Sequence, residues 1–156
     1  MRLFGELEIE RDGEAISVRG AKQRALLALL ALGRGSPVSA DRLIDQLWSD
    51  AQTAKPANAL QAQVVQLRRT LGASAVVTTE AGYALDLNAR DLDTAQFEDL
   101  VAEGRRLSAE GDAVLASAVL GDALRLRRGE PLSEFAYAGF ADAERAHLNE
   151  LALVAI

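Results

Sequence analysis

The hydrophobic pattern of residues 1–90 changes from strand periodicity to helical periodicity and back, and this order most limits what the chain can fold into. Alternating residues predict two pairs of short strands, 2–10 with 15–18 and 75–79 with 83–87. Apolar residues at helical spacing predict three helices between these pairs, at 20–32, 40–48 and 56–71. This is the element order of an α+β winged helix-turn-helix, whose third helix and final hairpin approach DNA.

Local signals fix the ends of these elements. Asp12-Gly13 is a hairpin turn signal between the first two strands. Ser39 is a favourable N-cap for the second helix, because its hydroxyl can accept from a free N–H of the first turn. Pro56 suits the first turn of the third helix, and Gly72 closes it. The predicted core stripe of the third helix is Leu60, Val64, Leu67 and Leu71.

The second part of the chain, residues 91–156, is predicted to be all α. Three helices are expected, at 93–109, 113–128 and 139–156. Small residues should let the first two approach closely, with Gly111 in the turn: Gly104, Ala116 and Ala123. This spacing is similar to that of a tetratricopeptide repeat. We therefore expect two domains, a winged helix at 1–90 and a partial tetratricopeptide-like helical domain at 91–156.

The distribution of charge supports different roles for the two domains. Residues 1–90 carry eleven Lys and Arg against ten Asp and Glu, a net charge of +1. Residues 91–156 carry six against thirteen, a net charge of −7. The first domain is therefore compatible with a polyanion as partner, and the second is not.

Composition argues against catalysis, metal binding and membrane insertion. The chain has no cysteine and a single histidine, His147, with no partner identifiable for it as a general base. No phosphate-binding loop or dinucleotide fingerprint is present. The longest apolar run, 25–32, is too short to span a bilayer. We expect a cytoplasmic protein that is not an enzyme and has no cofactor, no metal site and no membrane partner.

The third helix has an outward face suited to reading bases. At 100° per residue, the positions opposite the core stripe are Asn58, Ala62, Val65 and Arg69, flanked by Gln61, Gln66 and Arg68. Amides can bond adenine, arginine can bond guanine, and small apolar groups can contact the thymine methyl. An ordinary solvated helix face has a similar composition, so composition alone leaves both interpretations open.

Several motifs together resemble the antibiotic regulatory protein family of actinobacterial transcriptional activators (SARP). In the first domain they are Lys22-Gln23-Arg24-Ala25-Leu26-Leu27, Asp41-Arg42-Leu43-Ile44-Asp45, Leu47-Trp48, Asn58-Ala59-Leu60-Gln61, Leu67-Arg68-Arg69 and Gly82-Tyr83. In the second they are Phe97-Glu98, Gly111-Asp112, Arg128-Gly129 and Pro131-Leu132. The resemblance implies an OmpR-type winged helix followed by a bacterial transcriptional activator domain.

The resemblance also implies partners and site residues. It implies an activator of a biosynthetic gene cluster that binds direct repeats in double-stranded DNA, often as a dimer, and recruits RNA polymerase. The implied groove residues are Asn58, Gln61, Arg68 and Arg69, and the implied wing is at Gly82-Tyr83. Candidate phosphate contacts are Lys22, Arg24, Arg42 and Lys55. The implied polymerase-facing loop is Ser49, Asp50, Ala51, Gln52 and Thr53.

The chain departs from the family pattern at several basic positions. The family usually has arginine at the positions of Ala57, Gln66 and Ala84, serine at Val65, and proline at Glu80. Fewer phosphate contacts favour an alternative hypothesis, that the chain is a protein-interaction module which has lost strong DNA binding. The family's activator domain continues through further helices, so we expect Leu148, Leu151 and Val154 to lack a cover and to favour a homodimer.

Overall fold

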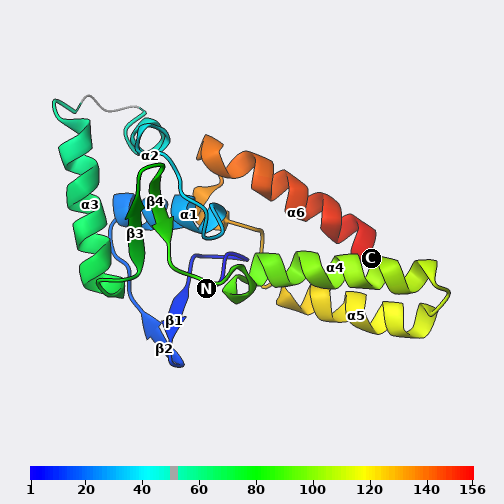
Figure 1. Ribbon diagram of the computed structural model, residues 1–156. Helices are drawn as coiled ribbons and strands as arrows, with labels where there is room; N and C mark the ends of the chain where they lie inside the picture. Colours follow the sequence, from blue (N-terminus) through cyan, green and yellow to red (C-terminus); the bar gives the residue numbers. More distant parts are fainter. Residues whose placement is uncertain (50–52) are drawn as a thin grey trace. The chain divides into compact units, whose positions relative to one another are not determined.

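The computed structural model describes residues 1–49 and 53–156 and divides the chain into two compact units (Figure 1). One unit comprises residues 9–89, and the other comprises residues 1–8 together with 90–156. The chain passes from one unit to the other after residue 8 and again after residue 89. The first eight residues therefore belong with residues 90–156, in what we call the helical unit.

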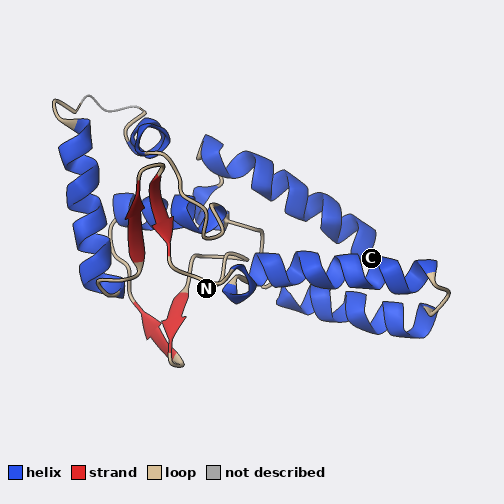
Figure 2. Ribbon diagram, in the orientation of Figure 1, coloured by secondary structure: helices blue, strands red, loops and turns tan. Residues whose placement is uncertain are grey.

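The unit of residues 9–89 is built from helices and two antiparallel hairpins (Figure 2). In its described part the helices are α1 (Ala21–Leu32), α2 (Ala40–Leu47) and α3 (Pro56–Leu71). The strands are β1 (Ile9–Arg11), β2 (Glu14–Ile16), β3 (Val76–Thr79) and β4 (Gly82–Leu85). The predicted winged helix is confirmed, because the helices and the second hairpin follow one another as the sequence pattern requires.

The local signals act as predicted. Asp12 and Gly13 both have positive φ, 53° and 81°, as a tight two-residue hairpin turn requires. The Ser39 hydroxyl accepts a hydrogen bond of 3.2 Å from the Arg42 N–H and caps α2. Gly72 follows the last residue of α3 with φ 115°, a conformation that L side chains rarely adopt.

One face of α3 is buried in the core of this unit. The four residues of the predicted stripe are at most 2% exposed: Leu60, Val64, Leu67 and Leu71. They pack in a core to which α1, α2 and the second hairpin contribute fully or almost fully buried residues: Leu26, Leu30, Leu43, Val76 and Leu85. The buried stripe fixes the rotation of α3, so its opposite face is turned to solvent.

The predicted strand at residues 2–10 is wrong over most of its length. Only Ile9–Arg11 forms a strand, and Gly5 turns the chain with φ 88°. Leu3 and Phe4 are adjacent yet both buried, which strict alternation does not allow. The reason lies in the helical unit, where the buried carboxylate of Asp93 accepts the Leu3 N–H at 2.7 Å and the Phe4 N–H at 3.1 Å.

The end of this N-terminal segment is tied down by ion pairs. Glu8 accepts from Arg128 at 3.1 Å and from Arg2 at 3.2 Å. The hydrogen bond from the Arg128 guanidinium holds the pKa of the Glu8 carboxyl below its usual value. All three side chains are well exposed, so these pairs add little stability compared with the buried Asp93 contacts.

The helical unit contains α4 (Asp93–Ala109), α5 (Ala113–Leu126) and α6 (Asp142–Ala155) within its described residues. Short 3-10 turns accompany them at Ala89–Asp91, Ser133–Phe135 and Gly139–Ala141. Helices α4 and α5 run antiparallel, side by side (Figure 1). A Cβ atom at Gly104 would lie 2.5 Å from the Leu120 side chain, so any larger residue would force Leu120 to move. The expected small residues in this helix pair are confirmed, because Ala116 and Ala123 are also buried.

The core of the helical unit includes the N-terminal segment. Phe4 packs edge-to-face on Phe97, with ring centroids 5.3 Å apart. Leu148 of α6 is fully buried in this cluster, so the expectation that it lacks a cover is wrong. Leu151 is half-buried, whereas Val154 is 51% exposed.

Candidate nucleic-acid interface

The outward face of α3 gathers six of the thirteen residues predicted to contact DNA. They are exposed side by side on this helix: Asn58, Gln61, Ala62, Val65, Gln66 and Arg69. The whole helix contains no Asp or Glu, in a chain with 23 acidic residues. A carboxylate-free face of amides, small apolar groups and one arginine is chemically suited to the edges of base pairs.

A buried hydrogen-bonded contact, which the sequence analysis did not identify, joins α1 to α3. The Gln23 amide nitrogen donates to the backbone oxygen of Gln63 at 2.9 Å and to its side-chain oxygen at 2.5 Å. Gln23 is 8% exposed, within a helix whose other inward residues are leucine and alanine. The sequence signal that could have found it is the lone amide of Gln23 among the leucines and alanines of this helix, since a buried amide needs a hydrogen-bond partner.

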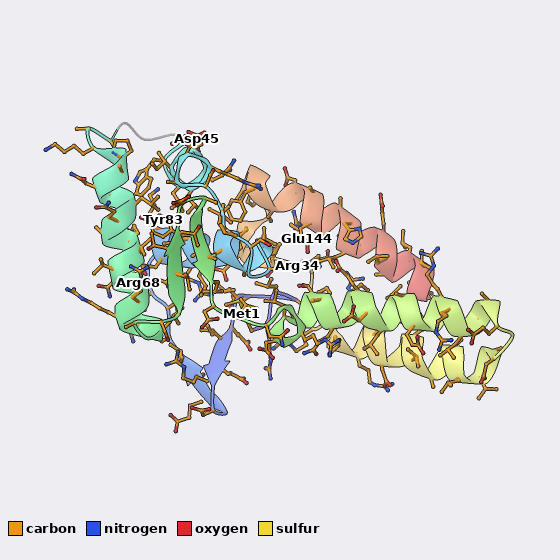
Figure 3. The ribbon with its side chains drawn as sticks, in the orientation of Figure 1. Met1, Arg34, Asp45, Arg68, Tyr83 and Glu144 are labelled. Atoms are coloured by element: carbon orange, nitrogen blue, oxygen red, sulfur yellow. The ribbon has the colours of Figure 1, made fainter. Side chains whose placement is uncertain are left out.

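Arg68 is positioned differently from Arg69. Its guanidinium donates to the Val76 backbone oxygen at 2.9 Å and to the Thr78 hydroxyl at 2.8 Å, both on β3. Figure 3 labels Arg68 on α3. Arg68 therefore joins the end of α3 to the wing, the β3–β4 hairpin. Arg69 is exposed and has no hydrogen-bond or ion-pair partner among the residues that the structure describes. Of this adjacent pair, Arg69 is the one whose guanidinium is available to a ligand.

The wing is held against the segment that precedes α2. Val38 and Tyr83 exchange two backbone hydrogen bonds, of 2.8 and 3.0 Å. Gly82 has φ 137°, and a Cβ atom there would lie 2.0 Å from the Val38 carbonyl oxygen. The predicted wing residues Gly82 and Tyr83 thus set the position of the hairpin, and its exposed tip is formed by Glu80 and Ala81.

Ala84 is buried in the wing, with only 7% of its surface exposed. The arginine that the family usually has at this position would therefore meet packed neighbours here. Introducing arginine there would force neighbouring side chains to move, at a cost of about 1–3 kcal/mol. Glu80 is therefore the wing position at which charge can be changed without disturbing the packing.

The four candidate phosphate contacts divide into two pairs. Lys22 donates to the Leu47 carbonyl at the end of α2, and its ammonium lies 5.7 Å from the Trp48 ring centroid. Arg24 donates to the Val18 carbonyl at 2.9 Å. Both side chains are thus engaged with this unit's own backbone. Arg42 and Lys55 are exposed and are the better placed of the four for an external anion.

Arg11 contacts the end of α3, a contact that sequence reasoning missed. Its guanidinium donates to the Leu71 carbonyl, the last residue of α3, and lies beside Gly72. A cation at this end interacts favourably with the helix dipole and satisfies a free carbonyl. The first hairpin is thereby attached to the C-terminal end of α3, a contact between distant residues that no local pattern encodes.

The connection between α2 and α3 was predicted to face RNA polymerase. Asp50, Ala51 and Gln52 lie outside the described residues. Ser49 is exposed and Thr53 is half-buried. Both line a surface hollow of about 670 Å³, together with Ile44, Asp45, Trp48, Ala54 and Pro56.

The structure also bears on metal binding and on membrane insertion. In residues 1–49 and 53–156, no group of three or more His, Asp or Glu side chains is arranged to hold a metal ion. Within the same residues, no helix has both the length and the apolar character needed to cross a membrane.

Comparison with known proteins agrees with this arrangement. Residues 13–85 match the family of C-terminal domains of transcriptional regulatory proteins, and residues 92–156 match the bacterial transcriptional activator domain. The regulatory protein DnrI of Streptomyces peucetius is 34% identical over 143 residues. The chain belongs to the antibiotic regulatory protein family of transcriptional regulators.

Two further family members extend the comparison. The regulatory protein AfsR of Streptomyces coelicolor is 32% identical over 95% of this chain. A solved structure of Mycobacterium tuberculosis EmbR, in complex with a low-affinity phosphopeptide, has a TM-score of 0.90 and 29% identity over 99% of this chain. The chain spans 53% of DnrI, 15% of AfsR and 42% of the EmbR chain, so the relatives contain parts without a counterpart here.

Proposed function

We propose that the chain is a sequence-specific DNA-binding transcriptional regulator that performs no catalysis. The observation that carries this proposal is the exposed face of α3, which lacks carboxylates and lies beside a wing attached through Arg68. An α-helix fits the major groove of DNA, and a hairpin next to it reaches the phosphate backbone or the minor groove. Asn58, Gln61 and Arg69 would contact base edges, and Arg42 and Lys55 would contact phosphates.

The family relationship supports further proposals about partners. We propose that the protein activates a biosynthetic gene cluster in the cytoplasm, binds direct repeats as a homodimer, and recruits RNA polymerase. The segment from Ser49 to Thr53 would face the polymerase. The adjoining hollow supports this, because it exposes part of Trp48, and aromatic residues are enriched where proteins bind one another.

One set of observations favours the alternative of a protein-interaction module. Lys22, Arg24 and Arg68 all donate to backbone carbonyls of their own unit, so fewer cations are available for phosphates. A gel-shift titration at low salt, on DNA from the promoter region of the protein's own gene, separates the two functions. Specific retardation supports DNA binding, and none at micromolar protein supports the interaction module.

Arg69 and Arg68 should have different effects on DNA binding. Arg69→Ala should change the preferred base at one position, by about 1–3 kcal/mol, because a bidentate pair of hydrogen bonds to the base is removed. Arg68→Ala should weaken binding to all sequences alike, because the wing loses its attachment to α3. Selection of bound sites from random duplexes measures both effects. An unchanged consensus for Arg69→Ala would contradict the assignment.

Glu80→Arg should tighten DNA binding, most strongly at low salt. The change replaces a carboxylate at the wing tip by a cation, and one added phosphate contact steepens the slope of log affinity against log salt by about 0.9. Fluorescence anisotropy over a salt series measures this slope. Glu14→Arg is the matched control, since it makes the same charge change on an exposed residue of β2, in the other hairpin. Equal slopes for Glu80→Arg and the parent would mean that the wing does not approach DNA.

A further inference from the structure

We infer that the α3 face reads an A·T-rich half-site through thymine methyl groups, with a G·C preference confined to the base pair beneath Arg69. This inference rests on the proposed DNA binding and specifies which sequences the site accepts. It names Val65 and Ala62 as the residues that determine specificity at the centre of the half-site. The supporting observations are the exposed apolar centre of the face and the engagement of Arg68 with the wing.

The centre of the outward face is apolar. Val65 is 44% exposed although valine is normally buried, and Ala62, three residues earlier, is exposed on the same side of the helix. Their axial separation is about 4.5 Å, from a rise of 1.5 Å per residue. This is close to the base-pair spacing of about 3.4 Å, so the two side chains can meet methyl groups of neighbouring steps. In the major groove only thymine presents such a methyl group.

The groups around this centre favour adenine. Asn58, Gln61 and Gln66 are exposed amides, and an Asn or Gln amide bonds the N6 and N7 atoms of adenine. The remaining glutamine of α3, Gln63, already accepts the Gln23 amide through its side-chain oxygen. Each amide that binds adenine also places a thymine on the opposite strand, which is consistent with methyl contacts at the centre.

Guanine recognition is limited to one end of the helix. Arg68 donates to Val76 and Thr78 on β3, which leaves Arg69 as the arginine of α3 that is exposed. Arg69 lies four residues, about 6 Å along the axis, beyond Val65. A G·C preference should therefore appear only at the edge of the A·T-rich centre, about two base-pair steps from the pair that Val65 contacts.

The test combines selection of bound sites from random duplexes with removal of thymine methyl groups. The selected site is resynthesised with uracil in place of thymine, which deletes the methyl group and keeps all base-pairing groups. For each methyl group that the protein contacts, its deletion should lower the affinity of the full chain for the duplex about fourfold, equivalent to about 0.8 kcal/mol. Anisotropy on thymine and uracil duplexes measures the ratio.

Two variants assign the effect to a side chain. Val65→Ser should bind thymine and uracil duplexes nearly equally, because the apolar partner of the methyl group is gone. Val114→Ser is the matched control: Val114 is 85% exposed but lies on α5, outside the proposed DNA-binding face, and it should leave the uracil effect unchanged. Both substitutions are on the surface and should alter stability by less than about 0.5 kcal/mol, which circular dichroism checks.

The outcomes are distinguishable. An A·T-rich consensus with a uracil effect that Val65→Ser abolishes supports the inference. A G·C-rich consensus, or a uracil effect that is absent or survives in Val65→Ser, overturns the inference and leaves DNA binding intact. If no duplex is enriched and none binds at low salt, both the inference and the proposed function fail.

Discussion

Replacing Asp93 with alanine should lower the free energy of unfolding of the helical unit by about 3–5 kcal/mol. The carboxylate is 8% exposed and accepts two backbone N–H groups, from Leu3 and Phe4. Hydrogen bonds to a charged group contribute about 1.5–3 kcal/mol each, and both N–H groups would be left buried without an acceptor. Asp93 is also the first residue of α4, where a negative charge interacts favourably with the helix dipole.

Urea denaturation followed by circular dichroism measures this loss. Asp99→Ala is the matched control, because Asp99 is an exposed aspartate of the same helix and should change stability by less than about 0.5 kcal/mol. Deletion of residues 1–8 should destabilise the helical unit to a similar extent, since it also removes Phe4 from the core. Equal midpoints for the two aspartate variants would show that the N-terminal segment is not held by Asp93.

Replacing Gly82 with alanine should displace the wing and lower the free energy of unfolding by about 2–4 kcal/mol. The added methyl group would lie 2.0 Å from the Val38 carbonyl oxygen, well inside van der Waals contact. Overpacking of this kind costs about 1–3 kcal/mol, and φ 137° adds backbone strain for any L side chain. The two hydrogen bonds between Val38 and Tyr83 should break as the hairpin moves away.

Gly13→Ala is the control that separates backbone strain at positive φ from the steric clash of an added Cβ atom. Gly13 also has positive φ, 81°, but a Cβ atom there would meet nothing within 4 Å. The Gly13→Ala variant should therefore lose only about 1 kcal/mol of its free energy of unfolding. If the wing contacts DNA, Gly82→Ala should also weaken binding to all duplexes, whereas Gly13→Ala should not. Thermal denaturation and anisotropy test both parts, and similar losses for the two variants would refute the role of the close approach.

Most of the winged-helix site could be predicted because its signals are local. The buried face of α3 is identified by the stripe of Leu60, Val64, Leu67 and Leu71, and the exposed face is the one opposite it. Glycine at Gly72 and Gly82 marks positions where the backbone needs positive φ. Such information lies within a few residues along the chain, so helix and turn preferences report it directly.

The hydrogen-bond partners of individual arginines could not be predicted in the same way. The helical wheel places Arg69 opposite the core stripe and Arg68 beside it, but only the folded wing supplies the Val76 and Thr78 oxygens that engage Arg68. Likewise, Ala84 resembles an empty position in the sequence yet is buried in the folded wing. The availability of a charge depends on neighbours that are distant in sequence.

The sequence by itself determined the order, length and exposed faces of the helices in residues 9–89 and the close α4–α5 pair, because periodicity, caps and small residues act locally. Only the tertiary structure decided where residues 1–8 belong. Their alternation favours a strand of the winged helix, but the buried Asp93 carboxylate and the Phe97 ring bind them about ninety positions away. Burying Phe4 and satisfying two backbone N–H groups outweighs a weak local preference for a strand.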